Sequence, residues 1–481
     1  MVEKLNDAIA AAGSFVWGPW FLIPLLLGTG IVLTVRLRGL QFSRLLAALR
    51  LGLLERHDAD SPGGDVSQFQ ALTTALAATV GTGNIVGVAG AIALGGPGAL
   101  FWMWVTGLLG MASKYSEAFL GVRFRTKDAK GEISGGPQYY LERGIKGPLG
   151  KVLGISFAVM AVLASFGIGN MTQANSIATN IHNTFHIQPW IIGVVLTVIA
   201  MVVLVGGIKS IGKVTALLVP FMIVAYVGGA IWILIANASL VPDAFATIFS
   251  EAFTGTAALG GAAGSAFMLA IQMGVARGIF SNESGMGSAA IAAAAAKTTH
   301  PVRQGLVSMT QTFIDTIVVV TFTGLVLITT GVWKEEGLSQ ALMTGQAFSH
   351  GLPGSWGHII VTLALALFAF STVLGWAYYG ERCMERLFGR ATVMPYRIFF
   401  SLIVYVGCTA ELKIVWNFSD LMNGLMAAPN LIGLLILSGL IARETHHYLK
   451  HDPKLRASRG EIDAFMEGHP GGIDTYETTG K

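Results

Sequence analysis

The feature that most constrains this chain is an interruption in its second apolar segment. Residues 69–94 are long and apolar enough to cross a bilayer, but the run Gly81-Thr82-Gly83-Asn84 lies in the middle. Glycine destabilises a helix interior, and the peptide groups freed by a break find no water in hydrocarbon. A break is tolerated there only where it faces protein, water or a ligand. We therefore interpret residues 81–84 as part of a binding site.

The composition indicates a polytopic membrane protein. Of 481 residues, 53% are hydrophobic and only 12% are charged, against about 25% charged in soluble domains. No basic patch interleaved with aromatic residues occurs, so we expect no nucleic-acid partner. Cys383 and Cys408 lack metal-ligand spacing, and the histidines at 446, 447 and 451 have no partner ligands at such spacing. We therefore expect no cofactor, no metal other than a transported ion, and a solvated tail.

Apolar windows of about 17–25 residues predict eleven transmembrane helices. They cover residues 15–35, 69–94, 98–121, 151–180, 189–208, 214–237, 263–296, 303–332, 357–380, 394–411 and 416–442. Lysine and arginine gather in every second gap and in the tail, for example five arginines between the first two spans. Because these residues accumulate on the cytoplasmic side, the N-terminus is expected outside and the C-terminus inside the plasma (inner) membrane. Residues 40–54 read as a short amphipathic helix on the inner surface.

The seventh span is also interrupted. Within residues 263–296, Gly274, Gly278, Gly285 and Gly287 bracket an arginine, an asparagine and a glutamate. Ten spans after the first divide into two sets of five with opposite orientation, each opening on an interrupted helix, which is the sequence pattern of a transporter with a central site. We predict an N-terminal part (1–66), a core (67–442) made of an inverted repeat (67–238 and 261–442), and a polar cytoplasmic tail (443–481).

Four motifs carry a resemblance to a known family. They are TVGTGNIVGVA (79–89), GGPGALFWMWVTGLLG (95–110), RGIFSNESGMGS (277–288) and FSTVLGWAYYGE (370–381). In this order they resemble the alanine/glycine:cation symporter family, sodium:amino-acid transporters of the leucine-transporter fold group. The resemblance covers about residues 15–442. It implies an all-α integral membrane fold, with two discontinuous helices, that imports a small neutral amino acid with sodium.

An amino-acid substrate needs donors for its carboxylate and a pocket sized for its side chain. Backbone N–H groups of Thr82, Gly83 and Asn84 are the natural carboxylate cradle, because half-helix ends attract charge. Gln173 resembles a pocket glutamine of the family, although interhelical hydrogen bonding is the alternative. Thr372 and Trp376 share one helix face, and the tryptophan leaves little volume beyond a methyl group. Phe280, beside the second break, is expected to close the pocket.

The cation ligands follow from the resemblance to the fold group. It implies one sodium on the Thr79 carbonyl and the Asn84 side chain, and a second on the carbonyls of Ala77 and Val80 with the hydroxyl of Ser371. For Thr79 and Thr82, hydroxyl bonding to the preceding turn is the alternative.

Ionisable residues inside spans are costly and usually functional or paired. We expect Asp315 either to coordinate a cation or to hydrogen-bond to the second broken helix. Arg277 and Glu283, on either side of the second break, are expected to form a gate or a structural ion pair. Lys114 is expected to extend to the inner interface, and Glu117 and Asp420 to be solvated or capped.

Other functions fit less well. A proton-coupled or glutamine-type symporter of the same fold stays open, as does the choice among glycine, L-alanine and D-alanine. An integral-membrane enzyme would need clustered histidine, aspartate or serine at one interface, and the sequence has no such motif. A passive channel would not need two broken helices in inverted halves.

Overall fold

The computed structural model describes residues 2–56, 58, 61, 63–254, 263–335, 337–354, 356–410 and 413–467. The regular secondary structure of this part of the chain is helical apart from one hairpin, β1 (Thr126–Lys127) with β2 (Ile133–Ser134), and an isolated bridge between Val66 and Ala296. The first group of helices is α1 (Val2–Val16), α2 (Leu22–Arg36), α3 (Leu40–Ser43), α4 (Leu45–Leu49), η1 (Arg50–Glu55), α5 (Gln68–Thr79), η2 (Gly83–Gly87), α6 (Val88–Gly95), α7 (Gly98–Arg123), α8 (Pro137–Gly144), α9 (Pro148–Phe166), η3 (Gly167–Met171), α10 (Thr172–Phe185), α11 (Pro189–Val205) and α12 (Gly207–Ala236). The second group is η4 (Ala238–Leu240), α13 (Val241–Thr254), α14 (Ala263–Asn282), α15 (Ala289–Ala294), α16 (Pro301–Thr312), η6 (Phe313–Val320), α17 (Thr321–Thr330), η7 (Val332–Lys334), α18 (Gln340–Gly351), α19 (Trp356–Phe388), η8 (Arg390–Thr392), α20 (Val393–Thr409), α21 (Lys413–His451) and α22 (Arg459–Met466).

Within these residues six helices are long and apolar enough to cross a membrane, and a seventh is added if one bent pair forms a single span. The bent pair is α5 with residues Gly83–Gly95, at an angle of 50°. The predicted helical membrane fold is confirmed at this level. The helices α2 and α11 are apolar but short, and the 26-residue α7 carries Lys114 and Glu117. The total of eleven spans therefore stays a prediction.

The first predicted span, 15–35, is divided in the structure. The helix α1 ends at Val16 and α2 begins at Leu22. The sequence between them contains Gly18-Pro19, and a residue before proline avoids the helical conformation. The amphipathic segment 40–54 is helical, as α3, α4 and η1.

Both predicted interruptions occur. The helix α5 ends at Thr79, and Val80 is extended, with ψ 91°. The helix α14 ends at Asn282, after which Glu283, Gly285 and Gly287 have φ of 54°, 88° and 82°. Glycine adopts such values without strain. The break is narrower than expected, because α14 continues through Gly274 and Gly278. There the missing side chains allow α7 to approach: an added Cβ would lie 2.4 Å from the Ala99 carbonyl oxygen and 2.5 Å from Thr106 Oγ1, respectively.

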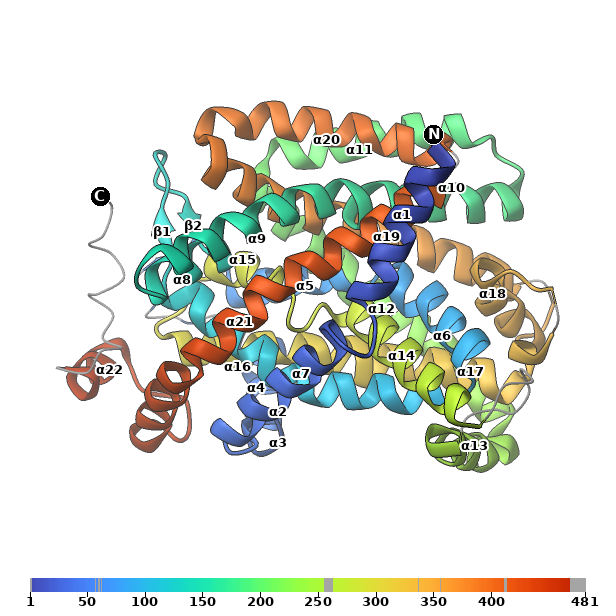
Figure 1. Cartoon of the computed structure of the whole chain (residues 1–481), viewed down its shortest axis with the longest axis horizontal. Coiled ribbons are helices and arrows are strands. Elements are labelled where there is room, and N and C mark those ends of the chain that lie inside the picture. Colours follow the sequence, from blue (N-terminus) through green and yellow to red (C-terminus); the bar gives the residue numbers. More distant parts are fainter. Residues whose placement is uncertain are drawn as a thin grey trace.

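The two ends of the helix bundle differ (Figure 1). The helices α13 and α18 lie at one end, while the β1–β2 hairpin, α8 and α22 lie at the other. The hairpin is held to the end of α19 by ion pairs of Arg382 with Asp128 (3.2 Å) and Glu132 (2.7 Å), and Arg390 joins the same two carboxylates. Burial alone would raise the pKa of Asp128, but backbone N–H donors and these two guanidinium groups hold that pKa below its usual value.

The expectation of a solvated tail holds only in part for its described residues, because many are exposed but several side chains are buried. The helix α21 continues to His451, and Tyr448 is buried against the ring of His300, 4.3 Å away between centroids. Arg303 donates to Tyr448 (2.8 Å) and pairs with Asp452 (3.1 Å). Although the tail is mostly polar in composition, it contains a few aromatic and aliphatic side chains, and these are enough to pack it against the bundle. Residues 468–481 lie outside the described residues.

Candidate functional site

The first break is closed by its own asparagine. The Gly81 N–H donates to Asn84 Oδ1 (2.9 Å), and Asn84 Nδ2 donates to Asp315 Oδ1 (2.8 Å). Both side chains are fully buried. The amide of Asn84 thus fixes the shape of the break and ties it to η6, 231 residues further along the chain.

Asp315 joins the two breaks. Its second oxygen, Oδ2, accepts hydrogen bonds from Ser281 in the last turn of α14 (2.9 Å) and from Thr316 (2.8 Å). The predicted hydrogen bond to the second broken helix is therefore present. The other predicted role, cation coordination, stays a prediction.

Two predicted substrate residues flank the first break. A Cβ added to Gly81 would lie 2.5 Å from Thr372 Oγ1 and 3.3 Å from Gln173 Oε1. The same Gln173 oxygen accepts from the Thr82 N–H at 3.4 Å. Thr82 Oγ1 is buried and has no hydrogen-bond partner in the described part of the chain. A buried hydroxyl without a partner at a helix break is consistent with a ligand site.

The group proposed around the second cation also comes together. The Ala77 carbonyl oxygen lies within hydrogen-bond distance of Ser371 Oγ (3.3 Å) and Thr372 Oγ1 (3.0 Å), and both hydroxyls also reach the Phe368 carbonyl of their own helix (2.8 and 3.1 Å). The Thr79 hydroxyl instead donates to carbonyls of the preceding turn, Ala75 (3.1 Å) and Leu76 (3.3 Å), and accepts from Gln311. The hydroxyl of Thr79 therefore follows the alternative, and the predicted roles of the Thr79 and Val80 carbonyls stay predictions.

Trp376 lies against the second break. Its Nε1 donates to Glu283 Oε1 at 2.7 Å, and its ring packs against Gly169, where an added Cβ would lie 2.3 Å from Trp376 Cβ. The side chain is buried. Its role as a limit on substrate size stays a prediction.

The predicted pairing of Arg277 with Glu283 is wrong in the structure. Arg277 Nη1 lies 3.9 Å from Asp420 Oδ2 of α21, while Glu283 accepts from Trp376 and Ser288. Six residues along a helix rotate the side chain to a different face, and Glu283 also lies past the end of α14 with a left-handed backbone. The two residues therefore face different neighbours.

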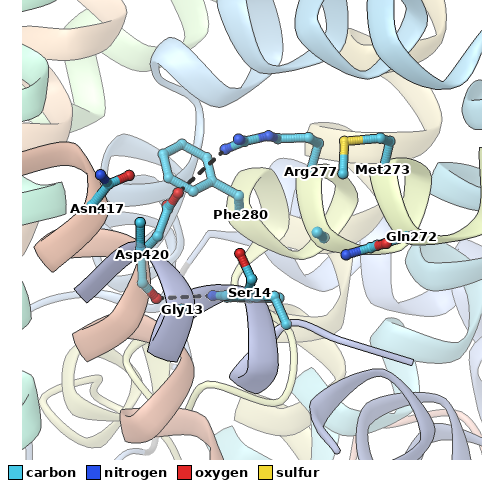
Figure 2. A pocket seen from close by; sticks show the side chains of 11 residues that line it. Gly13, Ser14, Gln272, Met273, Arg277, Phe280, Asn417 and Asp420 are labelled. Atoms are coloured by element: carbon cyan, nitrogen blue, oxygen red, sulfur yellow. Dashed lines mark hydrogen bonds and ion pairs between the residues drawn. The ribbon is translucent and has the colours of Figure 1, made fainter. Parts of the chain in front are cut away.

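Two cavities meet at Arg277 and Phe280. The larger, about 330 Å³, is lined by Thr82, Val86, Gly87, Gly90, Arg277, Phe280, Ser339, Gln340, Ala341 and Trp416. The smaller, about 180 Å³, lies between α1, α14 and α21, where Figure 2 shows Arg277 and Asp420 facing each other beside Phe280. The Phe280 ring stacks on Trp416 with centroids 6.4 Å apart. The larger cavity therefore reaches from Thr82 of the first break to α18.

Two buried charges differ from expectation. Lys114 does not extend to an interface: it is fully buried, and its Nζ donates to the Glu283 carbonyl oxygen at 2.9 Å. Glu117 is also fully buried, and its Oε2 lies 3.6 Å from Lys114 Nζ. Their spacing of three residues places both on one helix face, which is the sequence signal that could have identified the pair. Asp420 pairs with Arg277, which no local pattern indicates.

Comparison with known proteins places the chain among transporters. Residues 2–461 match the model of the sodium:alanine symporter family. The chain is 53% identical to "Sodium/alanine symporter AgcS" of Methanococcus maripaludis, with 91% of this chain and 96% of the relative covered. It is 37% identical to "Probable sodium/glutamine symporter GlnT" of Bacillus subtilis, with 94% and 92% covered.

The fold is also found among solved structures. One example is the crystal structure of MhsT in complex with L-phenylalanine, with a TM-score of 0.56 and 15% identity, over 80% of this chain and 99% of that one. At this identity the likeness shows the fold alone, and it agrees with the expected leucine-transporter fold group.

Proposed function

The chain belongs to the sodium:alanine symporter family, and from that membership we propose that it imports alanine or glycine together with sodium by alternating access around its two helix breaks. Because the family consists of transporters, an integral-membrane enzyme is excluded. The observation that carries the proposal is the contact of both breaks with one carboxylate: Asp315 accepts from Asn84 on one side and from Ser281 on the other. Such a link lets the state of one break affect the other.

The proposal includes eleven spans, of which the last ten form the inverted repeat, with the N-terminus outside. One observation supports this orientation. The lysine- and arginine-rich gaps include the segment with the β1–β2 hairpin, at the bundle end opposite α13 and α18 (Figure 1). The larger cavity is lined by the beginning of α18. We therefore infer a conformation whose site communicates with the outside, while the ion pairs around Asp128 close the inner end.

We assign the substrate to the first break. Its carboxylate would bind the N–H groups of Thr82, Gly83 and Asn84, replacing the Gln173 oxygen on Thr82. Gln173 and Thr372 would then contact its polar groups, Phe280 would cover it from the cavity side, and Trp376 would limit its side chain. The free hydroxyl of Thr82 supports this placement, because a carboxylate oxygen is the acceptor that it lacks.

We assign the coupling ions to oxygen atoms on the inner side of the same break. Thr79, Asn84 and Asp315 would contribute to one site, and Ala77, Val80 and Ser371 to the other. The convergence of two hydroxyls on the Ala77 carbonyl supports the second site, because hydroxyl and carbonyl oxygens are suitable ligands for a hard cation. Residues Arg277 and Asp420 would form the outer gate together with Phe280.

The test is substrate-competition uptake in proteoliposomes, with external sodium replaced by choline. We expect concentrative uptake of labelled alanine only with sodium, and strong competition by unlabelled alanine or glycine. Uptake at the full rate without sodium and without a proton gradient would contradict the coupling. Uptake driven by a proton gradient alone would favour the proton-coupled alternative. Stronger competition by glutamine than by alanine or glycine would favour the glutamine-type alternative. Large unitary currents in electrical recording would favour a channel.

Replacing Trp376 by alanine is expected to admit larger amino acids. A side chain that fills a pocket discriminates against extra methylene groups by about 10–200-fold, so leucine and glutamine should compete with alanine at least about tenfold better in the variant. The measurement is inhibition of alanine uptake over a concentration series. The matched control is Trp356→Ala, on the same helix but 65% exposed, which should leave the profile unchanged. An unchanged profile in Trp376→Ala would remove this residue from the pocket.

A further inference from the structure

Lys114 and Glu117 form a fully buried ion pair that the assignments above do not use. They lie one turn apart on α7, with Nζ and Oε2 separated by 3.6 Å. A buried lysine in a membrane span is costly, so it is usually paired and functional. The question is what this pair faces.

The lysine faces the carbonyl end of α14. Its Nζ donates to the Glu283 carbonyl oxygen at 2.9 Å, and Glu283 is the first residue after the helix ends at Asn282. The C-terminal end of a helix carries a partial negative charge and carbonyls without intrahelical partners. An ammonium group at this point satisfies both requirements.

The glutamate faces the N–H side of the same break. Glu117 Oε1 accepts from the Gly287 N–H (2.9 Å), just before α15 begins, and from Asn430 Nδ2 (2.8 Å). Asn430 also donates to the Gly285 carbonyl (2.8 Å). On α7, Lys114 therefore provides the cation at the carbonyl side of the second break. Glu117, one turn further along, provides the anion at the N–H side.

The first break has no such pair. In the described residues, the side chains that hydrogen-bond to residues 77–84 include one carboxylate, Asp315, which accepts from Asn84, but no positively charged group; the others are Asn84, Gln173, Gln311, Ser371 and Thr372. Its N–H groups and carbonyls are the ones assigned to the substrate carboxylate and to sodium. Both breaks thus present carbonyls on one side and N–H groups on the other. At the second break, charged side chains of α7 face these groups, whereas at the first break they are assigned to sodium and the substrate carboxylate.

We propose that Lys114 and Glu117 are resident ions of the second break, and that they occupy there the positions which the coupling cation and the substrate carboxylate occupy at the first. This inference rests on the proposed sodium-coupled transport. It explains why imported ions are required at only one break. Lys114 is accordingly a positioning residue, acting through the Glu283 carbonyl on the geometry of α14 and α15.

The test compares Lys114→Met with the neutral double variant K114M/E117Q in proteoliposomes. Without the ammonium group, the second break lacks its cation, so sodium-driven alanine uptake should fall by about tenfold or more, a change of about 1.4 kcal/mol. External sodium can then bind the Glu283 carbonyl and the Glu117 carboxylate. We therefore expect the melting temperature of Lys114→Met to rise more than that of the wild type when choline in the buffer is replaced by sodium. The double variant, which lacks the anion, should lose this extra rise and remain impaired in uptake.

The controls separate this role from a simpler one. Lys213→Met removes an exposed lysine and should leave both measurements unchanged. Uptake restored to the wild-type rate in K114M/E117Q would overturn the proposal, because Lys114 would then only neutralise Glu117. A sodium-dependent rise in Lys114→Met no larger than that of the wild type would also overturn it. If Lys114→Met is not monodisperse, the double variant, which removes the Glu117 carboxylate together with the ammonium group, decides by uptake. Failure of sodium coupling itself would be seen in the wild type.

Discussion

Replacing Asp315 by alanine is expected to reduce sodium-driven alanine uptake by about 100-fold or more. The variant removes the acceptor of three hydrogen bonds, from Asn84, Ser281 and Thr316. A buried donor left without a partner costs about 1–3 kcal/mol, and each 1.4 kcal/mol is about tenfold in rate or affinity. Two such losses at the junction of the breaks account for the expected effect. The measurement is the initial rate of uptake at saturating sodium.

Two further variants make this expectation specific. Asp243→Ala, an exposed aspartate on α13, is the matched control and should transport at the wild-type rate. Asp315→Asn keeps an oxygen for Asn84 but cannot accept from every present donor, so an intermediate rate is expected. Wild-type uptake by Asp315→Ala would show that the contact between the breaks is dispensable for transport.

Replacing Gly81 by alanine is the second change with a large expected effect, again about 100-fold in uptake. An added Cβ would lie 2.5 Å from Thr372 Oγ1 and 3.3 Å from Gln173 Oε1, closer than ordinary van der Waals contact. The hydroxyl of Thr372 must then leave the Ala77 carbonyl, which it now reaches at 3.0 Å. Both the substrate and the cation positions are disturbed. Uptake of alanine at varied sodium measures both effects together.

The control for this variant is Gly228→Ala in α12, where nothing lies within 4 Å of an added Cβ, and its uptake should be unchanged. A double variant tests the cause. If the clash with Thr372 is responsible, G81A/T372A should transport no worse than Thr372→Ala alone, because contacting residues are not additive. If the losses of uptake in the two single variants add in the double variant, the proposed contact is contradicted.

Sequence patterns predicted the breaks because their causes are local. Glycine at positions 81, 83, 285 and 287 disfavours continuous helix wherever it occurs in the fold. The group around Gly81 could be assembled only through resemblance to a family, since Gln173 and Thr372 lie on other helices. Once that resemblance is accepted, the structure does bring both side chains to the break.

The electrostatic partners could not be predicted, because they depend on how distant helices pack. Arg277 pairs with Asp420, and Lys114 donates to a carbonyl 169 residues away. For Lys114, hydropathy favours extension to the interface, and only the packing of α7 against α14 places an acceptor within its reach. The packed tail has a similar cause. Tyr448 is one aromatic residue in a polar segment, and its burial depends on Arg303 in α16 and on His300, the residue just before that helix.

The Lys114–Glu117 pair also has a consequence for the order in which the chain is made. Because α7 precedes α14 by more than a hundred residues, as a predicted span it would enter the bilayer before the Glu283 carbonyl exists. An isolated lysine would oppose that insertion. A glutamate one turn away lets the helix insert as a locally neutral unit, so the ions that later complete the second break are delivered inside a segment that can be inserted on its own.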